Sequence, residues 1–425
     1  MQHSSKDDYV NCIKNYTNQF KENSFRKIAC NDFKSWPGPR EETWRLSRLG
    51  TLSRKKIKPI TPNLQKKING KSKHIGSKII KFVDGAYRGD LSSEMPLGVN
   101  LSSLNDSESL EYLQKLKKSN LNHHPSTNVS LSCTPSIMKL TVKKNVKVKD
   151  FFEIIYEGGE ESQSVHPVLY VELEENSSLY LIERFNHFST LAMPLQLTEI
   201  RNKASLNSIK IFNDNKETYN LSAHCVHLSE ESNLNSFSLI KGGMFTRSET
   251  HAYLNGCGSK LSLNGIYISG NNQHHDLTTA IYHDVPDCTS KQIVRGVLGG
   301  KSTGVFQGKV RVAQDAQRTD GQQMSRAILI SENANANAKP ELEIYADDVI
   351  CAHGATVGEL DDDQLFYLNS RGVPMDKARE ILIKAFLEDM INQSVDNSLH
   401  DFVFKEAELA LSSIITKETL QNETL

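Results

Sequence analysis

A weak internal repeat most constrains what this chain can fold into. Four leucines, each two residues after a Ser or Ala, stand at positions 179, 206, 234 and 261, so they are spaced 27, 28 and 27 residues apart. A fixed period between about 20 and 50 residues is typical of solenoids, in which each repeat packs only on its neighbours. The kind of element in each repeat then decides which solenoid the chain can form.

The repeats contain short strands rather than helices. From about Leu131 onward, alternating apolar and polar runs such as 168–173, 209–212 and 237–240 are separated by Ser, Asn and Gly. Few of the intervals leave room for a helix, so each period is best explained as one turn of a parallel β-helix. The pattern predicts a mainly β fold, with a β-helix core over residues 126–356, an N-terminal helical and loop-rich region over 1–125 and a C-terminal helical domain over 357–425.

The C-terminal domain is expected to cover one end of the solenoid. Apolar residues recur at helical spacing at Ala378, Ile381, Leu382, Ala385 and Phe386, and a further helix is expected over 400–415. Because the ends of a solenoid must be covered, we expect these helices to pack against each other and against the end of the β-helix.

Charge and composition exclude several classes of function. The net charge of −1 favours neither nucleic acid nor a membrane surface, and no apolar run approaches the roughly 18 residues of a membrane helix. The seven cysteines are scattered, which is typical of a reducing compartment, so we expect a cytoplasmic protein. A basic segment over 51–81 is interpreted as a solvated linker or edge, with phosphate binding as the alternative.

Other motifs that could carry chemistry have more ordinary explanations. The run from Gly296 to Ser302 resembles a phosphate loop, but the glycine spacing is one residue short and a strand is expected to follow. Histidines gather at His274, His275 and His283 and at His224 and His227, and Cys225-x-His227 places two donors on one strand face. We interpret them as strand residues, with metal binding as the alternative.

A second Cys-x-His pair lies where the strand pattern stops. Cys351 and His353 are two residues apart, so on an extended backbone both side chains point to the same face. Glycines at 354 and 358 follow, and a helical pattern begins at Asp361. Thiolate and imidazole are ligands for iron, but two donors are too few to hold a metal cluster. A second polypeptide would have to supply the rest.

Three long motifs identify the family that this chain resembles. VFQGKVRVAQDAQRTDGQQ (305–323), KPELEIYADDVICAHGATVGELD (339–361) and QLFYLNSRGV (364–373) are similar in wording and order to the SufB/SufD family of iron–sulfur cluster assembly proteins. The ADDV-x-C-x-HGATVG wording resembles the SufD branch of that family more than the SufB branch.

The resemblance implies a fold, partners and a site. The fold would be a right-handed parallel β-helix flanked by N- and C-terminal α-helical regions, and the role that of a non-catalytic scaffold. A SufB-like subunit would bind the β-helix end, where Cys351 and His353 would be candidate ligands of iron or an iron–sulfur cluster. A SufC-like ATPase would bind the C-terminal helices, and the complex would bind reduced flavin. The candidate contacts with the ATPase are Leu365, Phe366, Tyr367, Arg371 and Phe386.

Two alternatives remain open at this point. One is a secreted-type β-helix enzyme acting on polysaccharide, which the free cysteines and the N-terminal sequence disfavour. The other is a homodimeric scaffold without a SufB-like partner, because an exposed strand end can pair with a second copy by two-fold symmetry.

Overall fold

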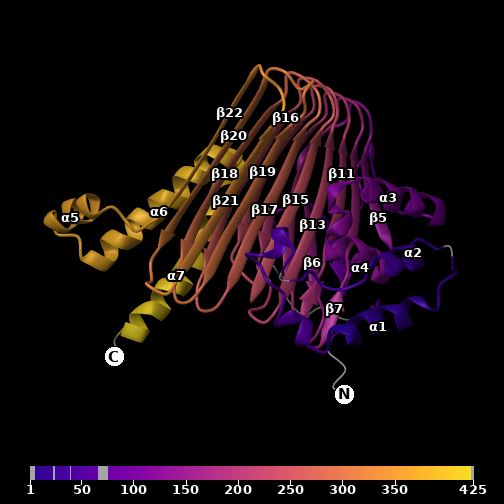
Figure 1. Cartoon of the computed structure of the whole chain (residues 1–425), viewed down its shortest axis with the longest axis horizontal. Coiled ribbons are helices and arrows are strands. Elements are labelled where there is room, and N and C mark those ends of the chain that lie inside the picture. The colour runs from indigo at the N-terminus through magenta and orange to yellow at the C-terminus, as the bar shows by residue number, and fades with distance from the viewer. Residues whose placement is uncertain (1–4, 23, 39, 66–74, 423–425) are drawn as a thin grey trace.

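Two long sheets form the body of the protein. The computed structural model describes residues 5–22, 24–38, 40–65 and 75–422. Within these ranges one sheet, called sheet A, has 12 strands and the other, sheet B, has 10. Successive strands of the repeat region alternate between the sheets, so each turn of the chain adds one strand to each, as in a parallel β-helix (Figure 1).

The bounds of the elements are as follows. Sheet A contains β1 Lys58–Pro59, β4 Val99–Ser103, β5 Ile137–Val142, β7 Gln163–Val165, β8 Val168–Leu173, β10 Leu191–Ala192, β11 Leu195–Ile200, β13 Tyr219–Leu228, β15 Phe245–Leu254, β17 His274–His283, β19 Thr303–Val312 and β21 Asn335–Ile344. Sheet B contains β2 Lys78–Val83, β3 Ala86–Tyr87, β6 Lys147–Gly158, β9 Ser178–His187, β12 Ser205–Phe212, β14 Asn233–Ile240, β16 Lys260–Ser269, β18 Thr289–Leu298, β20 Thr319–Leu329 and β22 Val349–Gly358. The α-helices are α1 Ser5–Thr17, α2 Phe25–Asp32, α3 Asp106–Lys118, α4 Pro125–Cys133, α5 Asp362–Ser370, α6 Met375–Ser394 and α7 Asn397–Asn422, and the short 3₁₀ helices are η1 Glu42–Trp44, η2 Leu52–Arg54, η3 Gly89–Leu91 and η4 Asn120–His123.

The leucine repeat is the register of sheet B. Leu179, Leu206, Leu234 and Leu261 are direct partners in successive parallel pairs of strands, and all four are buried between the two sheets. The aromatic rings of Tyr156, Phe185 and Phe212 stack beside them, with centroid distances of 4.8 and 4.5 Å. The predicted β-helix is therefore confirmed, and its repeat corresponds to one turn.

Helices cover the outer faces of both sheets. Helices α2, α3 and α4 pack on sheet A through a cluster that includes Tyr112, Leu131 and Tyr170. Helices α6 and α7 pack on sheet B, whose outer face carries an apolar row. The members of that row are Ile182, Ile209, Ile211, Phe237, Leu239, Ile266, Ile268 and Val297. The two ends of the chain thus lie on opposite sides of the β-helix (Figure 1).

The expectation that the C-terminal helices would cover the end of the solenoid is wrong. They lie along the side of it, where they bury the apolar residues on the outer face of sheet B. The predicted helical stripe is wrong in part for the same reason. The structure buries Ala378, Ile383, Leu387, Met390 and Ile391 of α6, and leaves Ile381 and Ala385 exposed.

The N-terminal region contributes strands as well as helices. Strands β2, β3 and β4, which come from residues 1–125, are the first members of the two sheets. Much of the basic segment 51–81 lies here: β1 pairs with β7, β2 pairs with β6, and Lys81 forms an ion pair with Glu157 at 2.8 Å. Its residues 66–74 lie outside the described residues.

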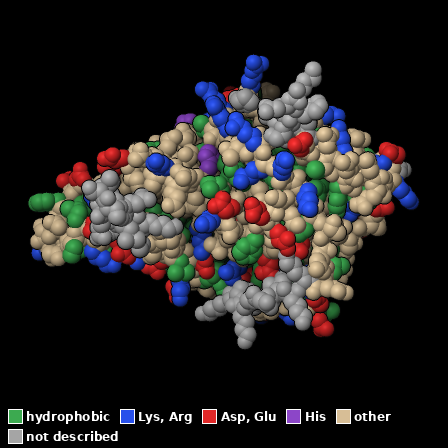
Figure 2. Space-filling view, turned by 90° about the horizontal axis from the view of Figure 1, so that it is seen from below, with side chains coloured by type: hydrophobic (Ala, Val, Ile, Leu, Met, Phe, Trp, Pro, Cys, Tyr) green, Lys and Arg blue, Asp and Glu red, His purple; other side chains and the backbone are tan. Residues whose placement is uncertain are grey.

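The surface and the helices bear on the expected partners. Lys and Arg side chains are interspersed with Asp and Glu over the face shown in Figure 2, in keeping with the net charge of −1. Within the ranges that the structure describes, none of the helices has the length and apolar character needed to cross a lipid bilayer.

Candidate functional site

The last turn of the β-helix has an open edge. Among the described residues, β21 is paired only with β19, and β22 only with β20. Strand β21 carries Lys339, Pro340, Glu341 and Glu343, which are side chains that discourage further pairing. Strand β22, with the sequence VICAHGATVG, contains no charged residue and no proline. It therefore presents an unprotected row of backbone hydrogen-bonding groups to another chain.

Cys351 and His353 lie on this edge strand and face the inside of the β-helix. Their partners in β20 are Gly321 and Gln323, which belong to the buried, inward set of that strand. Cys351 is half-buried and packs on the end of the core, while His353 is exposed because no further turn covers it. The prediction that the two side chains share one face follows from the strand geometry and agrees with this register.

The environment of Cys351 favours the protonated form of its thiol. Burial raises the pKa of the Cys351 thiol, and the nearby Asp320 carboxylate raises it further. A thiol must lose its proton to bind a metal, so binding at this position would release a proton. Among the described residues, the structure brings together no group of three or more His, Cys, Asp or Glu side chains that could hold a metal ion.

The other histidines that the sequence singled out are occupied within the fold. His274 is hydrogen-bonded to Ser47 at 2.8 Å, His275 to Ser269 at 2.7 Å and His283 to Ser290 at 2.8 Å. Burial lowers the pKa of His275 to about 3 and that of His283 to about 4, so both are neutral at pH 7. These contacts support their interpretation as structural residues.

The pair Cys225 and His227 has the same spacing as the edge pair but a different setting. It lies on β13 in the middle of sheet A, with Cys225 buried and its sulfur 3.6 Å from the Nε2 atom of His227. The His227 ring stacks on Tyr253 at a centroid distance of 5.0 Å. Because neighbouring strands cover both sides of β13, a second chain cannot extend the sheet there.

A buried ionic network was not foreseen from the sequence. Arg247 of β15 is fully buried and donates hydrogen bonds to Glu249 at 2.6 and 2.9 Å and to Asp276 at 2.9 Å. Its guanidinium lies 4.1 Å from the ring centroid of Trp44, and it also donates to the backbone oxygen of Thr43. The network anchors the N-terminal segment to sheet A. Glu249 is close to Arg247 in the sequence, but Trp44 and Asp276 lie too far from it to form a recognisable motif.

The candidate contacts of the C-terminal domain differ in exposure. Leu365 is buried, whereas Phe366 is 74% exposed and Tyr367 is also exposed, with Arg371 5.3 Å from its ring centroid. Phe386 is half-buried, and the guanidinium of Arg295 lies 4.7 Å from its ring centroid. Helix α5 projects from the body on the side of β22, and hydrophobic side chains appear at its tip (Figures 1 and 2).

A groove of about 690 Å³ separates α5 and α6 from the end of sheet B. Acidic side chains predominate among the charged groups that line it, including Glu332, Glu359, Asp362 and Asp376. The groove marks the place where α5 leaves the body of the protein.

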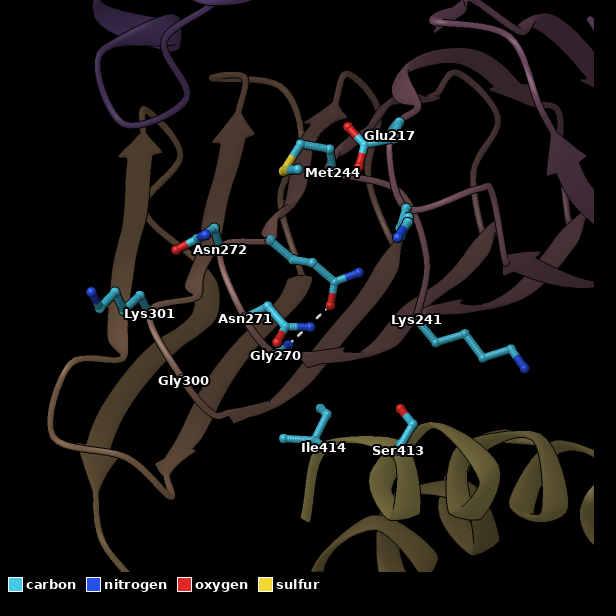
Figure 3. A pocket seen from close by; sticks show the side chains of 12 residues that line it. Glu217, Lys241, Met244, Gly270, Asn271, Asn272, Gly300, Lys301, Ser413 and Ile414 are labelled. Atoms are coloured by element: carbon cyan, nitrogen blue, oxygen red, sulfur yellow. Dashed lines mark hydrogen bonds between the residues drawn. The ribbon is translucent and has the colours of Figure 1, made fainter. Parts of the chain in front are cut away.

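A second hollow is lined by turns of the β-helix and by α7. It has a volume of about 600 Å³ and lies between the turns at 216–217, 270–273 and 300–301 and the residues Ser413 and Ile414 of α7 (Figure 3). The Gly300-Lys301 turn joins β18 to β19, with Gly300 at a φ of +62°. Strand β19 follows this turn where a phosphate loop needs a helix, so the expectation that a strand follows the motif is confirmed.

Comparison with known proteins shows which family the chain is similar to. A family model described as SUF system FeS cluster assembly, SufBD core domain, matches residues 155–386, which is more than half of the chain. The chain is 34% identical to the iron–sulfur cluster assembly protein SufD of Escherichia coli over 247 residues, covering 57% of this chain and 58% of that protein. It is 28% identical over 279 residues to Protein ABCI7, chloroplastic, of Arabidopsis thaliana, covering 63% and 59%. It is 32% identical over 148 residues to SufD of Bacillus subtilis, covering 35% and 34%. The matched parts therefore span less than two thirds of these relatives.

Proposed function

The chain belongs to the SufB/SufD family of iron–sulfur cluster assembly proteins and is most like SufD, and from this premise we propose that it is a scaffold subunit. In this proposal a SufB-like subunit binds the open end of the β-helix, and a SufC-like ATPase binds the C-terminal helices. Iron or a nascent cluster binds where this chain and the SufB-like subunit meet.

One observation carries the proposal: the edge strand without charged residues or proline bears the two candidate ligands. Sheet extension by a partner strand would satisfy the free backbone groups of β22 and cover Ile350, which is 69% exposed. The same contact would enclose Cys351 and His353 between two chains. A site shared in this way lets relative movement of the subunits open or close it.

The donor set suits the proposed cargo. Thiolate sulfur and imidazole nitrogen are both ligands of iron–sulfur clusters. Two donors from this chain would leave the remaining iron positions to the partner, so the cluster would be substrate of the complex rather than a resident cofactor of this chain. Binding of reduced flavin by the assembled complex stays a prediction.

Helix α5 supports the second part of the proposal. Its exposed Phe366 and Tyr367 lie on a projecting helix, where an aromatic pair can enter a pocket of a partner. Phe386 is engaged with Arg295 and Leu365 is buried, so we propose that these two residues hold the projection in place.

The test is a pair of substitutions with the same spacing and different settings. His353→Ala removes the donor at the open edge, and His227→Ala removes the equivalent donor in the middle of sheet A. Each variant is assembled with the SufB-like and SufC-like proteins, and iron and acid-labile sulfide are measured per complex. We expect His353→Ala to assemble but to lose most of its iron and sulfide, and His227→Ala to match the wild type. Equal iron contents in the two variants would remove the ligand role.

A homodimer through the same edge is the second candidate, because β22 is equally open to a second copy of this chain. Native mass measurement of the full chain, alone and mixed with the SufB-like protein, separates the two. We expect the SufB-like protein to displace any homodimer, whereas a homodimer that persists in its presence would favour the second candidate.

A further inference from the structure

A column of polar side chains leads from the interior of the β-helix to His353. Gln292 of β18 is the direct partner of Gln323 of β20, and Gln323 is the direct partner of His353 of β22. All three point inward, in three successive turns. Neighbouring strands are about 4.8 Å apart, a spacing across which a long side chain such as glutamine can contact the side chain of its paired residue.

Gln323 is the member of this column whose side chain lacks a partner. It is 3% exposed, and neither its Oε1 nor its Nε2 atom has a hydrogen bond within the described part of the chain. In Gln292, by contrast, the Oε1 atom accepts a hydrogen bond from Thr279. Buried polar side-chain atoms are almost always hydrogen-bonded in folded proteins, so the carboxamide of Gln323 has a partner to find.

Two glycines lie beside the carboxamide and the candidate ligands. Across the interior, Gly308 of β19 has no side chain, and a Cβ atom there would lie 3.3 Å from the Nε2 atom of Gln323. Beside it, a Cβ atom on Gly321 would lie 3.4 Å from the sulfur of Cys351. Glycine at position 308 therefore leaves room for the Phe306 ring and the Gln323 carboxamide, and glycine at position 321 leaves room for the Cys351 sulfur.

We propose that Gln323 is a positioning residue for His353, an inference that rests on the proposed ligand role of His353. In this proposal the Gln323 side chain rotates from its unpartnered position so that its carboxamide oxygen accepts a hydrogen bond from one ring N–H of His353. This contact fixes the tautomer and the ring orientation, so that the lone pair of the other ring nitrogen is directed toward the cargo. Histidines that bind metals almost always donate their second N–H to such an acceptor, and a neutral amide does so without adding negative charge to the site.

The first test needs neither partner nor metal. The full-length chain is labelled with ¹⁵N-histidine, His353 is assigned by comparison with His353→Ala, and the tautomer ratio is read at pH 8.5, where an ordinary imidazole is neutral. We expect one tautomer to dominate in the wild type and in Gln323→Glu, which keeps an acceptor. We expect a mixture in Gln323→Met, which has a similar shape and no acceptor.

Gln292→Met is the matched control, because it removes a buried amide one turn deeper in the same column. It should leave the tautomer ratio of His353 at the wild-type value. A ratio that Gln323→Met does not change would overturn the proposal, and so would an equal change in Gln292→Met. Should Gln323→Met fail to fold, Gln323→Glu decides alone, since loss of the dominant tautomer in that variant contradicts the proposal.

The second test uses the assembled complex. We expect Gln323→Met to retain iron 10- to 100-fold more weakly, which is about the effect of losing such a supporting contact. In a His353→Ala background the same substitution should have no further effect, because Gln323 acts through His353. If His353→Ala itself leaves the iron content unchanged, the proposed function fails. If His353→Ala abolishes iron retention and Gln323→Met does not alter it, only the positioning role fails.

Discussion

Truncation of Leu387 tests whether the C-terminal helices are held by the side of the β-helix. Leu387 of α6 is 1% exposed and lies in the cluster that joins α6 and α7 to the outer row of sheet B. Ile381 of the same helix is 39% exposed and lies outside that cluster. The sequence pattern predicted Ile381 as a member of the packed stripe and did not include Leu387. Alanine substitutions at the two positions therefore separate the observed packing from the predicted one.

The expected costs differ by several-fold. Truncating a buried leucine to alanine costs about 2–5 kcal/mol, and we expect about 3 kcal/mol for Leu387→Ala because a helix can move slightly to fill the cavity on a rigid sheet. Ile381→Ala should cost about 1 kcal/mol or less, since much of the side chain is already in water and alanine adds a few tenths of a kcal/mol of helix propensity.

Hydrogen exchange followed by mass spectrometry measures the effect where it occurs. We expect the amides of α6 and α7 to exchange about a hundredfold faster in Leu387→Ala than in the wild type, with the strands between the sheets unchanged. Ile381→Ala should change the helical rates by less than tenfold. If the two variants gave equal rates, or if the strands exchanged as fast as the helices, the reasoning about this interface would be refuted.

Three further predictions concern His275, Ile350 and Phe366. Stability to urea should fall between pH 7 and pH 5, because burial lowers the pKa of His275 to about 3 while in the unfolded chain it is about 6.5. The stabilisation is complete above the unfolded value and is lost as the pH falls, by about 2 kcal/mol at pH 5, and His275→Gln should remove that part of the slope in urea titrations at several pH values. Ile350→Lys should leave the unfolding midpoint unchanged and weaken binding of the SufB-like protein at least tenfold by titration calorimetry, whereas Phe188→Lys, at a similarly exposed residue away from β22, should not. Phe366→Ala should abolish co-purification of the SufC-like ATPase without changing the circular dichroism of the chain, and undiminished co-purification would contradict the proposed contact.

The architecture of the core could be predicted from the sequence because each leucine repeat corresponds to one turn of the β-helix. Leucines at equal intervals stack on one another whenever each interval is one turn, and the alternating runs between them leave only strands as the repeating element. The side on which the C-terminal helices pack could not be predicted in the same way. Helix α6 has apolar residues on more than one face, and which face is buried depends on the outer row of sheet B.

One part of the candidate site could be predicted from the sequence and another part could not. The common face of Cys351 and His353 follows from their spacing alone, since strand side chains alternate. Gln323 could not be found, because the turns lengthen toward the end of the β-helix. Gln292 pairs with Gln323 across 31 positions, and Gln323 with His353 across 30. Counting back 27 or 28 residues from His353, as the leucine repeat suggests, leads to Arg326 or Ser325 instead.

The outer row of sheet B also sets an order of events during synthesis. Its last strand residue, Val297, is made about 110 residues before Leu411 of α7, which helps to cover the row. At a synthesis rate of about 5–20 residues per second, the part of this apolar row that α7 covers would stay exposed on the ribosome for roughly 6–20 s. A chain that ends before α7 would lack this cover, so we expect such a product to aggregate or to be degraded.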